Sequence, residues 1–198
     1  MKRGVLRRVL RPKIFPWYAM AALLIWRADP TPVRIGVGLL LVVAGEGLRF
    51  WSAGHLIKNR HLTISGPYAH LRHPLYAGTM LVGVGLLWMG GGSTAPWLLG
   101  VGLLYFFLHY LPYKERIESA RLERRYGDAY RRYRRAVRAL LPSLHPWSDP
   151  ELARDDGWSA ERVRANNEDG AALAVALAAA VVLLQPVLTA ALRRLLGP

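Results

Sequence analysis

The sequence contains no cysteine. This absence excludes disulfide bonds, thiolate zinc sites and a cysteine nucleophile. Acidic residues are also few, because 13 aspartates and glutamates stand against 27 lysines and arginines, for a formal net charge of +14. Such an excess fits either nucleic acid or anionic lipid headgroups as a partner. The basic runs directly flank long apolar segments, so we expect a membrane surface and no nucleic-acid partner.

Hydrophobic residues make up 53% of the chain and are gathered in five blocks, at about 14–27, 33–57, 75–91, 95–113 and 171–192. A membrane-spanning helix needs about 20 mostly apolar residues. The pattern therefore predicts an all-α fold, a multi-span membrane helix bundle with four core spans and a fifth, C-terminal span. The basic start of the chain is similar to that of a signal peptide, but no small-residue cleavage site follows 14–27 closely. We expect this block to stay as the first span.

The distribution of basic residues predicts the orientation. The segments 1–13, 58–74 and 114–170 are rich in lysine and arginine, whereas the connections near 27–34 and 90–94 carry little charge. The positive-inside rule then places the N-terminus and the loop at 58–74 in the cytoplasm of an integral, multi-pass membrane protein. A fifth span would leave Arg193 and Arg194 on the other side, which makes it the weakest of the set.

The segment 114–141 has the pattern of an amphipathic helix. Its apolar face consists of Leu122, Tyr126, Tyr130, Tyr133, Val137 and Leu140, and its opposite face of Arg124, Arg125, Arg131, Arg132, Arg135 and Arg138. This spacing predicts a helix that lies on the membrane or caps other helices. A kink is expected at Gly127, and Pro142 is expected to end the helix. The chain then divides into a core at 1–142, a polar linker at 143–170 with a short helix near 158–166, and the added span at 171–198.

Glycine pairs and buried charges occur inside the predicted spans. Gly-Val-Gly-Leu-Leu recurs at 36–40, 83–87 and 100–104, and small residues in spans favour close helix packing over dinucleotide binding. Glu46 and Arg49 are three residues apart, so they can pair on one helix face. Ionisable groups in a membrane are functional candidates, although such a pair can also serve only to fix packing. The histidines show no zinc-like spacing, and we expect no metal.

Residues 66–78 form a polar stretch between two apolar blocks, Gly-Pro-Tyr-Ala-His-Leu-Arg-His-Pro-Leu-Tyr-Ala-Gly. Pro74 suits the first turn of a helix, which places His73 at the N-cap. Free amides and the positive helix end there predict an anion site, to which Arg72 adds a donor for a carboxylate. The other interpretation is a charged loop that only leads the chain into the membrane.

The pattern Gly-Pro-Tyr-x-x-x-Arg-His-Pro-x-Tyr-x-Gly, a membrane hairpin and then Tyr-Gly-x-x-Tyr-x-x-Tyr resembles the isoprenylcysteine carboxyl methyltransferases and phospholipid N-methyltransferases over about residues 33–142. The resemblance implies a membrane enzyme with S-adenosylmethionine in a pocket between the cytoplasmic ends of the spans, capped by the amphipathic helix. The implied cofactor-binding residues are Tyr68, Arg72, His73, Pro74, Tyr76, Gly78, Glu115 and Glu118. The chain departs from the family at Ser119, where a second glutamate is usual, and Glu115 is the candidate substitute. It also has Thr79 where an apolar residue is usual.

Methyl transfer mainly requires positioning of donor and acceptor, without a metal or a covalent nucleophile. For a carboxylate acceptor the candidate clamp is Arg49, and for an amine a base is needed, from His73, Glu118 or Glu46. The resulting expectation is an S-adenosylmethionine-dependent methyltransferase with Arg49, His73 and Glu118 as catalytic residues and a lipid-like or isoprenoid-linked substrate at the cytoplasmic face. Two alternatives stay open: a membrane reductase of the sterol-reductase type that uses NADPH, and a non-catalytic membrane anchor.

Overall fold

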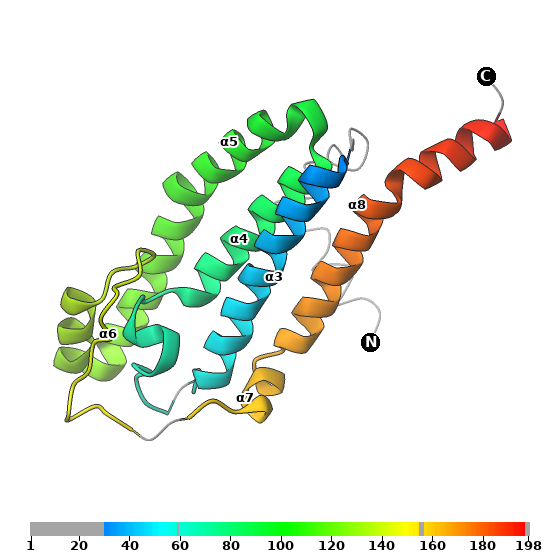
Figure 1. The fold of residues 1–198 in the computed structure, drawn as a ribbon. Coiled ribbons are helices and arrows are strands. Elements are labelled where there is room, and N and C mark those ends of the chain that lie inside the picture. Colours follow the sequence, from blue (N-terminus) through cyan, green and yellow to red (C-terminus); the bar gives the residue numbers. More distant parts are fainter. Residues whose placement is uncertain (1–29, 59, 155–156, 197–198) are drawn as a thin grey trace, which may run out of the picture.

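The computed structural model describes residues 30–58, 60–154 and 157–196, which form helices and loops without a strand among them. The long helices are α3 (Pro32–His55), α4 (Pro74–Gly90), α5 (Ala95–Tyr105), α6 (Leu111–Ala136) and α8 (Glu168–Leu196), with the short α7 (Ala160–Ala165) before α8. In Figure 1, α3 lies between α4 and α8, and α7 lies at the C-terminal end of α3. The expected all-α fold is confirmed for these residues. The block 14–27 lies outside them.

Two of the described helices are long and apolar enough to cross a membrane, by length and composition. One is the continuous helix Gly92–Ala136 and the other is Glu168–Val187, while Pro74–Gly90 is a shorter apolar helix. The C-terminal block is thus helical, and α8 begins three residues before its predicted start. The finding is compatible with a membrane helical protein, and the number of spans stays a prediction.

Glycines bring α3 and α4 into close contact. A Cβ built on Gly38 would lie 2.7 Å from the carbonyl oxygen of Gly85, and one built on Gly45 would lie 2.7 Å from that of Gly78. Side chains at these positions would push the two backbones apart. The packing interpretation is therefore confirmed for Gly38 and Gly85, the second glycines of the first two Gly-Val-Gly-Leu-Leu copies, whereas a Cβ on Gly36 or Gly83 meets nothing within 4 Å. In the third copy, a Cβ on Gly100 meets nothing within 4 Å.

The helix after the α4–α5 hairpin differs from the prediction. A 3-10 turn (η2, Gly92–Thr94) makes the hairpin, and a π turn (η3, Phe106–Tyr110) joins α5 to α6, so the amphipathic helix continues the preceding apolar one. The kink at Gly127 is confirmed, with φ 52° and ψ −124°. The predicted end at Pro142 is wrong, because α6 ends at Ala136 and Val137 is already extended. The chain leaves the helix there to pair with the loop that precedes α4.

The segment predicted as a polar linker packs against the C-terminal end of α3. The indole N–H of Trp158 donates to the carbonyl oxygen of Phe50 at 3.1 Å. The amide of Asn166 donates to the carbonyl oxygens of Ala53 and Leu56, at 3.0 and 3.1 Å. The carbonyl groups of Ala53 and Leu56 lie at the end of α3, where a helix leaves carbonyl groups without an i+4 partner. The expected short helix near 158–166 is present as α7.

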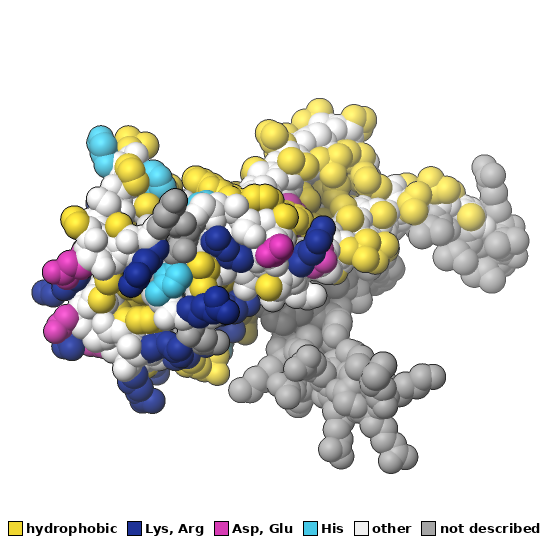
Figure 2. Space-filling model, turned by 90° about the horizontal axis from the view of Figure 1, so that it is seen from below, with side chains coloured by type: hydrophobic (Ala, Val, Ile, Leu, Met, Phe, Trp, Pro, Cys, Tyr) yellow, Lys and Arg dark blue, Asp and Glu magenta, His cyan; other side chains and the backbone are white. Residues whose placement is uncertain are grey.

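Basic side chains gather at the end of the molecule where α6 and α7 lie. Figure 2 views this end and shows lysine and arginine over the polar part, with hydrophobic surface beside it. The arginines of the predicted polar face of α6 are exposed, as expected: Arg124, Arg125, Arg131, Arg132 and Arg135. At this end, the loop 66–73 and the residues that follow α3 pack against α6.

Candidate functional site

A cavity of about 510 Å³ lies at this polar end, between the residues that follow α3, the loop into α4, and α6. Its size is within the range of small-molecule sites, roughly 300–1,000 Å³. Of the residues predicted from the resemblance, six line it: Tyr68, Arg72, His73, Pro74, Tyr76 and Glu118. The lining brings together two segments more than 40 residues apart in the chain.

The start of α4 has the predicted cap but no free amides at its two preceding residues. His73 is the N-cap and Pro74 the first helical residue. The backbone N–H of Arg72 donates to the carbonyl of Arg138 at 2.8 Å, and that of His73 donates to the carbonyl of Ala139 at 3.0 Å. The prediction of free amides for an anion is therefore wrong for these two groups. They bind the chain that leaves α6 instead.

Arg72 was expected to bind a carboxylate of a ligand, but it binds the carboxylate of Glu115 in the same chain. Its Nη2 donates to Glu115 Oε1 at 2.5 Å and its Nη1 to the carbonyl oxygen of Arg134 at 3.1 Å. The Arg72 side chain is 9% exposed and that of Glu115 is 22% exposed, so the pair is largely shielded from water. Arg72 therefore fastens the loop to both ends of α6, and Glu115 acts on the cavity through Arg72.

His73, Tyr76 and Glu118 form the polar centre of the cavity wall. The Tyr76 hydroxyl donates to a carboxylate oxygen of Glu118. The rings of His73 and Tyr76 stack at 5.3 Å between centroids, and His73 Nδ1 lies 3.7 Å from Glu118 Oε2. Burial lowers the pKa of His73, and the nearby Glu118 and Glu115 oppose this only in part. The imidazole is thus neutral near pH 7 and able to accept a proton.

Buried tyrosines of α6 close the inner side of the cavity. The Tyr133 hydroxyl donates to the carbonyl oxygen of Tyr68 at 2.8 Å. Ser119 is buried, and its hydroxyl is 2.7 Å from that of Tyr130. The position at which the family usually has a second glutamate therefore faces a tyrosine hydroxyl here. The helical spacing predicted that Tyr130 lies on the apolar face, but nothing in the sequence indicated its hydrogen bond with Ser119.

The lining also contains basic residues that the sequence analysis did not single out as cavity residues. Lys58 and Arg121 line the cavity and are exposed. Lys58 follows α3 in a short loop, and Arg121 lies on α6 one turn beyond Glu118. Both sit within basic segments of the sequence, and only the fold distinguishes them from the other cations there.

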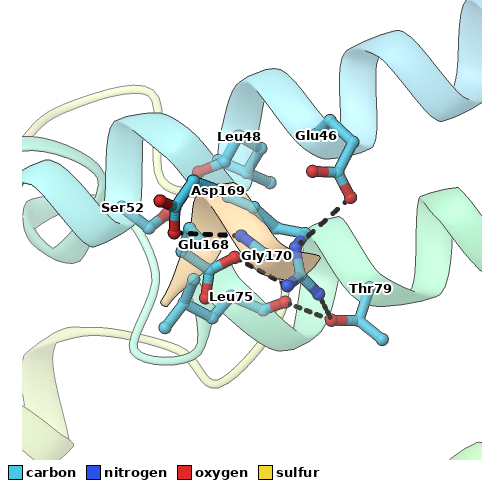
Figure 3. A network of polar contacts seen from close by, with 9 residues as sticks. Glu46, Leu48, Ser52, Leu75, Thr79, Glu168, Asp169 and Gly170 are labelled. Atoms are coloured by element: carbon cyan, nitrogen blue, oxygen red, sulfur yellow. Dashed lines mark hydrogen bonds and ion pairs between the residues drawn. The ribbon is translucent and has the colours of Figure 1, made fainter. Parts of the chain in front are cut away.

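Arg49, Glu46 and Gly78 lie outside this lining, at the contact between α3 and α4. The predicted pairing of Arg49 with Glu46 is confirmed, at 3.4 Å. Figure 3 shows Glu46, Thr79 and Glu168 arranged around the guanidinium. A Cβ built on Gly78 would lie 2.6 Å from Arg49 Cγ, so Gly78 gives room for this side chain. The predicted roles of these residues in methyl transfer stay predictions.

We compared the chain with known proteins. No protein-family profile matches it, and no solved structure matches it. A curated protein that does match is the Protein-S-isoprenylcysteine O-methyltransferase of Schizosaccharomyces pombe, which is 30% identical over 106 residues. This match confirms the resemblance to the isoprenylcysteine carboxyl methyltransferases. The alignment covers 52% of this chain and 42% of the relative, so the chain spans less than half the length of the curated relative it matches.

Proposed function

We propose that the chain is an S-adenosylmethionine-dependent methyltransferase of the membrane, with its site at the cytoplasmic face. The acceptor is a carboxylate of a lipid-like or isoprenoid-linked substrate, and an amine is the second candidate. The observation that carries the proposal is the cavity in which the Arg-His-Pro-x-Tyr loop meets Glu118 of α6. The name of the matched relative supports O-methylation of an isoprenylcysteine.

The residues of the cavity fit this methyl donor, which has groups of both charges and an aromatic base. The carboxylate of Glu118 can accept hydrogen bonds from the ammonium group or the ribose hydroxyls of the donor. The cationic side chains of Lys58 and Arg121 can bind its carboxylate. Tyr68 and Tyr76 offer aromatic faces beside these groups. The Nε2 atom of His73 is buried and makes no hydrogen bond. An unpartnered buried nitrogen is costly, so a bound ligand that supplies a partner is favoured.

The bound donor would supply an electrophilic methyl group, which is taken by the acceptor as the carbon–sulfur bond breaks. The protein has to align the two reactants and keep water away. A carboxylate acceptor needs no base, because no proton is lost. An amine acceptor needs one, and His73 is suited to this role because its lowered pKa keeps it unprotonated near pH 7. An apolar tail would reach the site sideways from the bilayer.

Calorimetry on the protein in detergent tests the cofactor. We expect S-adenosylmethionine to bind the wild type, and Glu118→Gln or His73→Ala to weaken this binding at least about tenfold. The matched control is Arg116→Ala, an exposed residue on the same helix, which should bind normally. Binding of NADPH alone would replace the proposal with a reductase, and binding of neither would favour a non-catalytic anchor.

Labelled methyl donor then identifies the acceptor. Transfer to the free acid of N-acetyl-S-farnesylcysteine supports a carboxylate acceptor. Transfer to phosphatidylethanolamine in mixed detergent micelles, with the farnesylated acid left unmodified, supports an amine instead. The two substrates are compared in one detergent, so that access from the micelle is equal.

A further inference from the structure

A carboxylate from the C-terminal segment occupies Arg49, the predicted clamp for a carboxylate acceptor. Glu168 is the first residue of α8, it is buried, and its Oε2 accepts a hydrogen bond from Arg49 Nη2 at 2.6 Å. The two residues are 119 positions apart. Glu168 also lies outside the part of the chain over which the family resemblance was recognised.

Two of the three guanidinium nitrogens of Arg49 donate hydrogen bonds, and the third, Nε, makes a longer ion-pair contact without a hydrogen bond. Nη1 donates to Thr79 Oγ1 at 2.7 Å, Nη2 to Glu168, and Nε faces Glu46 at 3.4 Å. One cation therefore stands between two carboxylates (Figure 3). A carboxylate in place of Glu168 would leave the charge balance of Arg49 unchanged, because Glu46 remains. Such an exchange avoids the large cost of leaving a buried charge unpaired.

The cluster lies close to the cavity and reaches the surface of the bundle. Thr79 donates to the carbonyl oxygen of Leu75, which lines the cavity one helical turn away. Thr79 itself is exposed, so the Nη1 side of Arg49 opens onto the surface of α4 that an apolar acceptor would follow. On the other side, Glu168 is followed at once by the exposed Asp169 and Gly170. A displaced Glu168 would therefore have the surface of the molecule close by.

We infer that Glu168 is a specificity-determining residue, which holds Arg49 in the absence of acceptor and is displaced by the acceptor's carboxylate. The inference rests on the proposed function, because it concerns the acceptor of that reaction. The C-terminal segment would then help to select the methyl acceptor. An acceptor binds at this site only when its carboxylate competes with Glu168 for the guanidinium of Arg49. In the product, the methylated carboxyl group carries no charge. Glu168 therefore forms its ion pair with Arg49 again, which favours release of the product.

The test measures binding of N-acetyl-S-farnesylcysteine as the free acid and as the methyl ester. In Glu168→Gln the amide oxygen can still accept from Arg49, so the anchor is kept and the competing charge is removed. We expect the acid to bind about tenfold more tightly to this variant than to the wild type, and the ester to bind both equally. Adding Arg49→Gln should abolish the gain. The control is Asp169→Asn, whose carboxylate is exposed and accepts a hydrogen bond from the backbone N–H of Gly170.

The outcomes separate this inference from the proposed function. Equal or weaker binding of the acid in Glu168→Gln, with normal binding of S-adenosylmethionine, overturns the inference and leaves the proposed function standing. A variant that is only less stable to heat, with acid binding unchanged, shows that Glu168 is a structural anchor. Absence of S-adenosylmethionine binding in every variant counts against the proposed function, while tighter acid binding would still support the competition at Arg49.

Discussion

The ion pair between Arg72 and Glu115 should be a main support of the cavity wall. Arg72→Ala removes the bond to Glu115 and the bond to the Arg134 carbonyl. The guanidinium is a charged donor in both bonds, and a hydrogen bond that involves a charged group contributes about 1.5–3 kcal/mol. Because the Arg72 side chain is only 9% exposed, screening by water is small. We expect the free energy of unfolding to fall by about 3 kcal/mol.

Equilibrium unfolding in mixed micelles measures this loss, in a double-mutant cycle with Glu115→Ala. The two single changes should lose the same pair, so the double mutant should cost less than their sum by about 1–3 kcal/mol. Arg72→Lys should recover only part of the loss, since one ammonium does not reproduce the planar fork. Arg116→Ala, next to Glu115 and exposed, should stay within about 0.5 kcal/mol of the wild type. Additive single changes would refute the pair as a support.

Three further outcomes follow from the packing and the charges. Gly38→Ala should lower the melting temperature, because its Cβ would meet a backbone oxygen, whereas Gly36→Ala, with open space, should leave it equal or raise it. Ser119→Ala should cost about 1–3 kcal/mol by leaving the Tyr130 hydroxyl buried without its partner, and adding Tyr130→Phe should recover part of this cost. Burial lowers the pKa of His73 below 6.5, so the unfolded chain binds more protons from about pH 6.5 down to the folded pKa. The free energy of unfolding should therefore fall as pH is lowered through this window, and less so in His73→Gln; equal pH profiles would contradict the assignment.

The helical body could be predicted because its signals are local. Apolar blocks of sufficient length gave α3, α4, α5 and α8, and the proline after His73 gave the start of α4. The glycine pairs indicated that two spans pack closely, although only the structure shows that Gly38 meets Gly85. Helix length and capping depend on residues that are neighbours in the chain, so they can be predicted from a single sequence.

The errors in the site come from contacts between distant segments. The amides of Arg72 and His73 looked free because their partners, the carbonyls of Arg138 and Ala139, lie more than 60 residues away. The same pairing draws the chain out of α6 before Pro142. Neither periodicity nor a cap residue predicts such a contact, because it depends on how the loop and the end of α6 pack against each other in the fold.

The hydrogen bonds from Trp158 and Asn166 to the C-terminal part of α3 limit how far the chain can be shortened. A fragment that stops at 142, where the family resemblance stops, would remove the donors to the carbonyls of Phe50, Ala53 and Leu56. The stretch that carries the family motifs and the stretch whose segments pack together are therefore different, and fragments intended for biochemistry need to extend past Glu168.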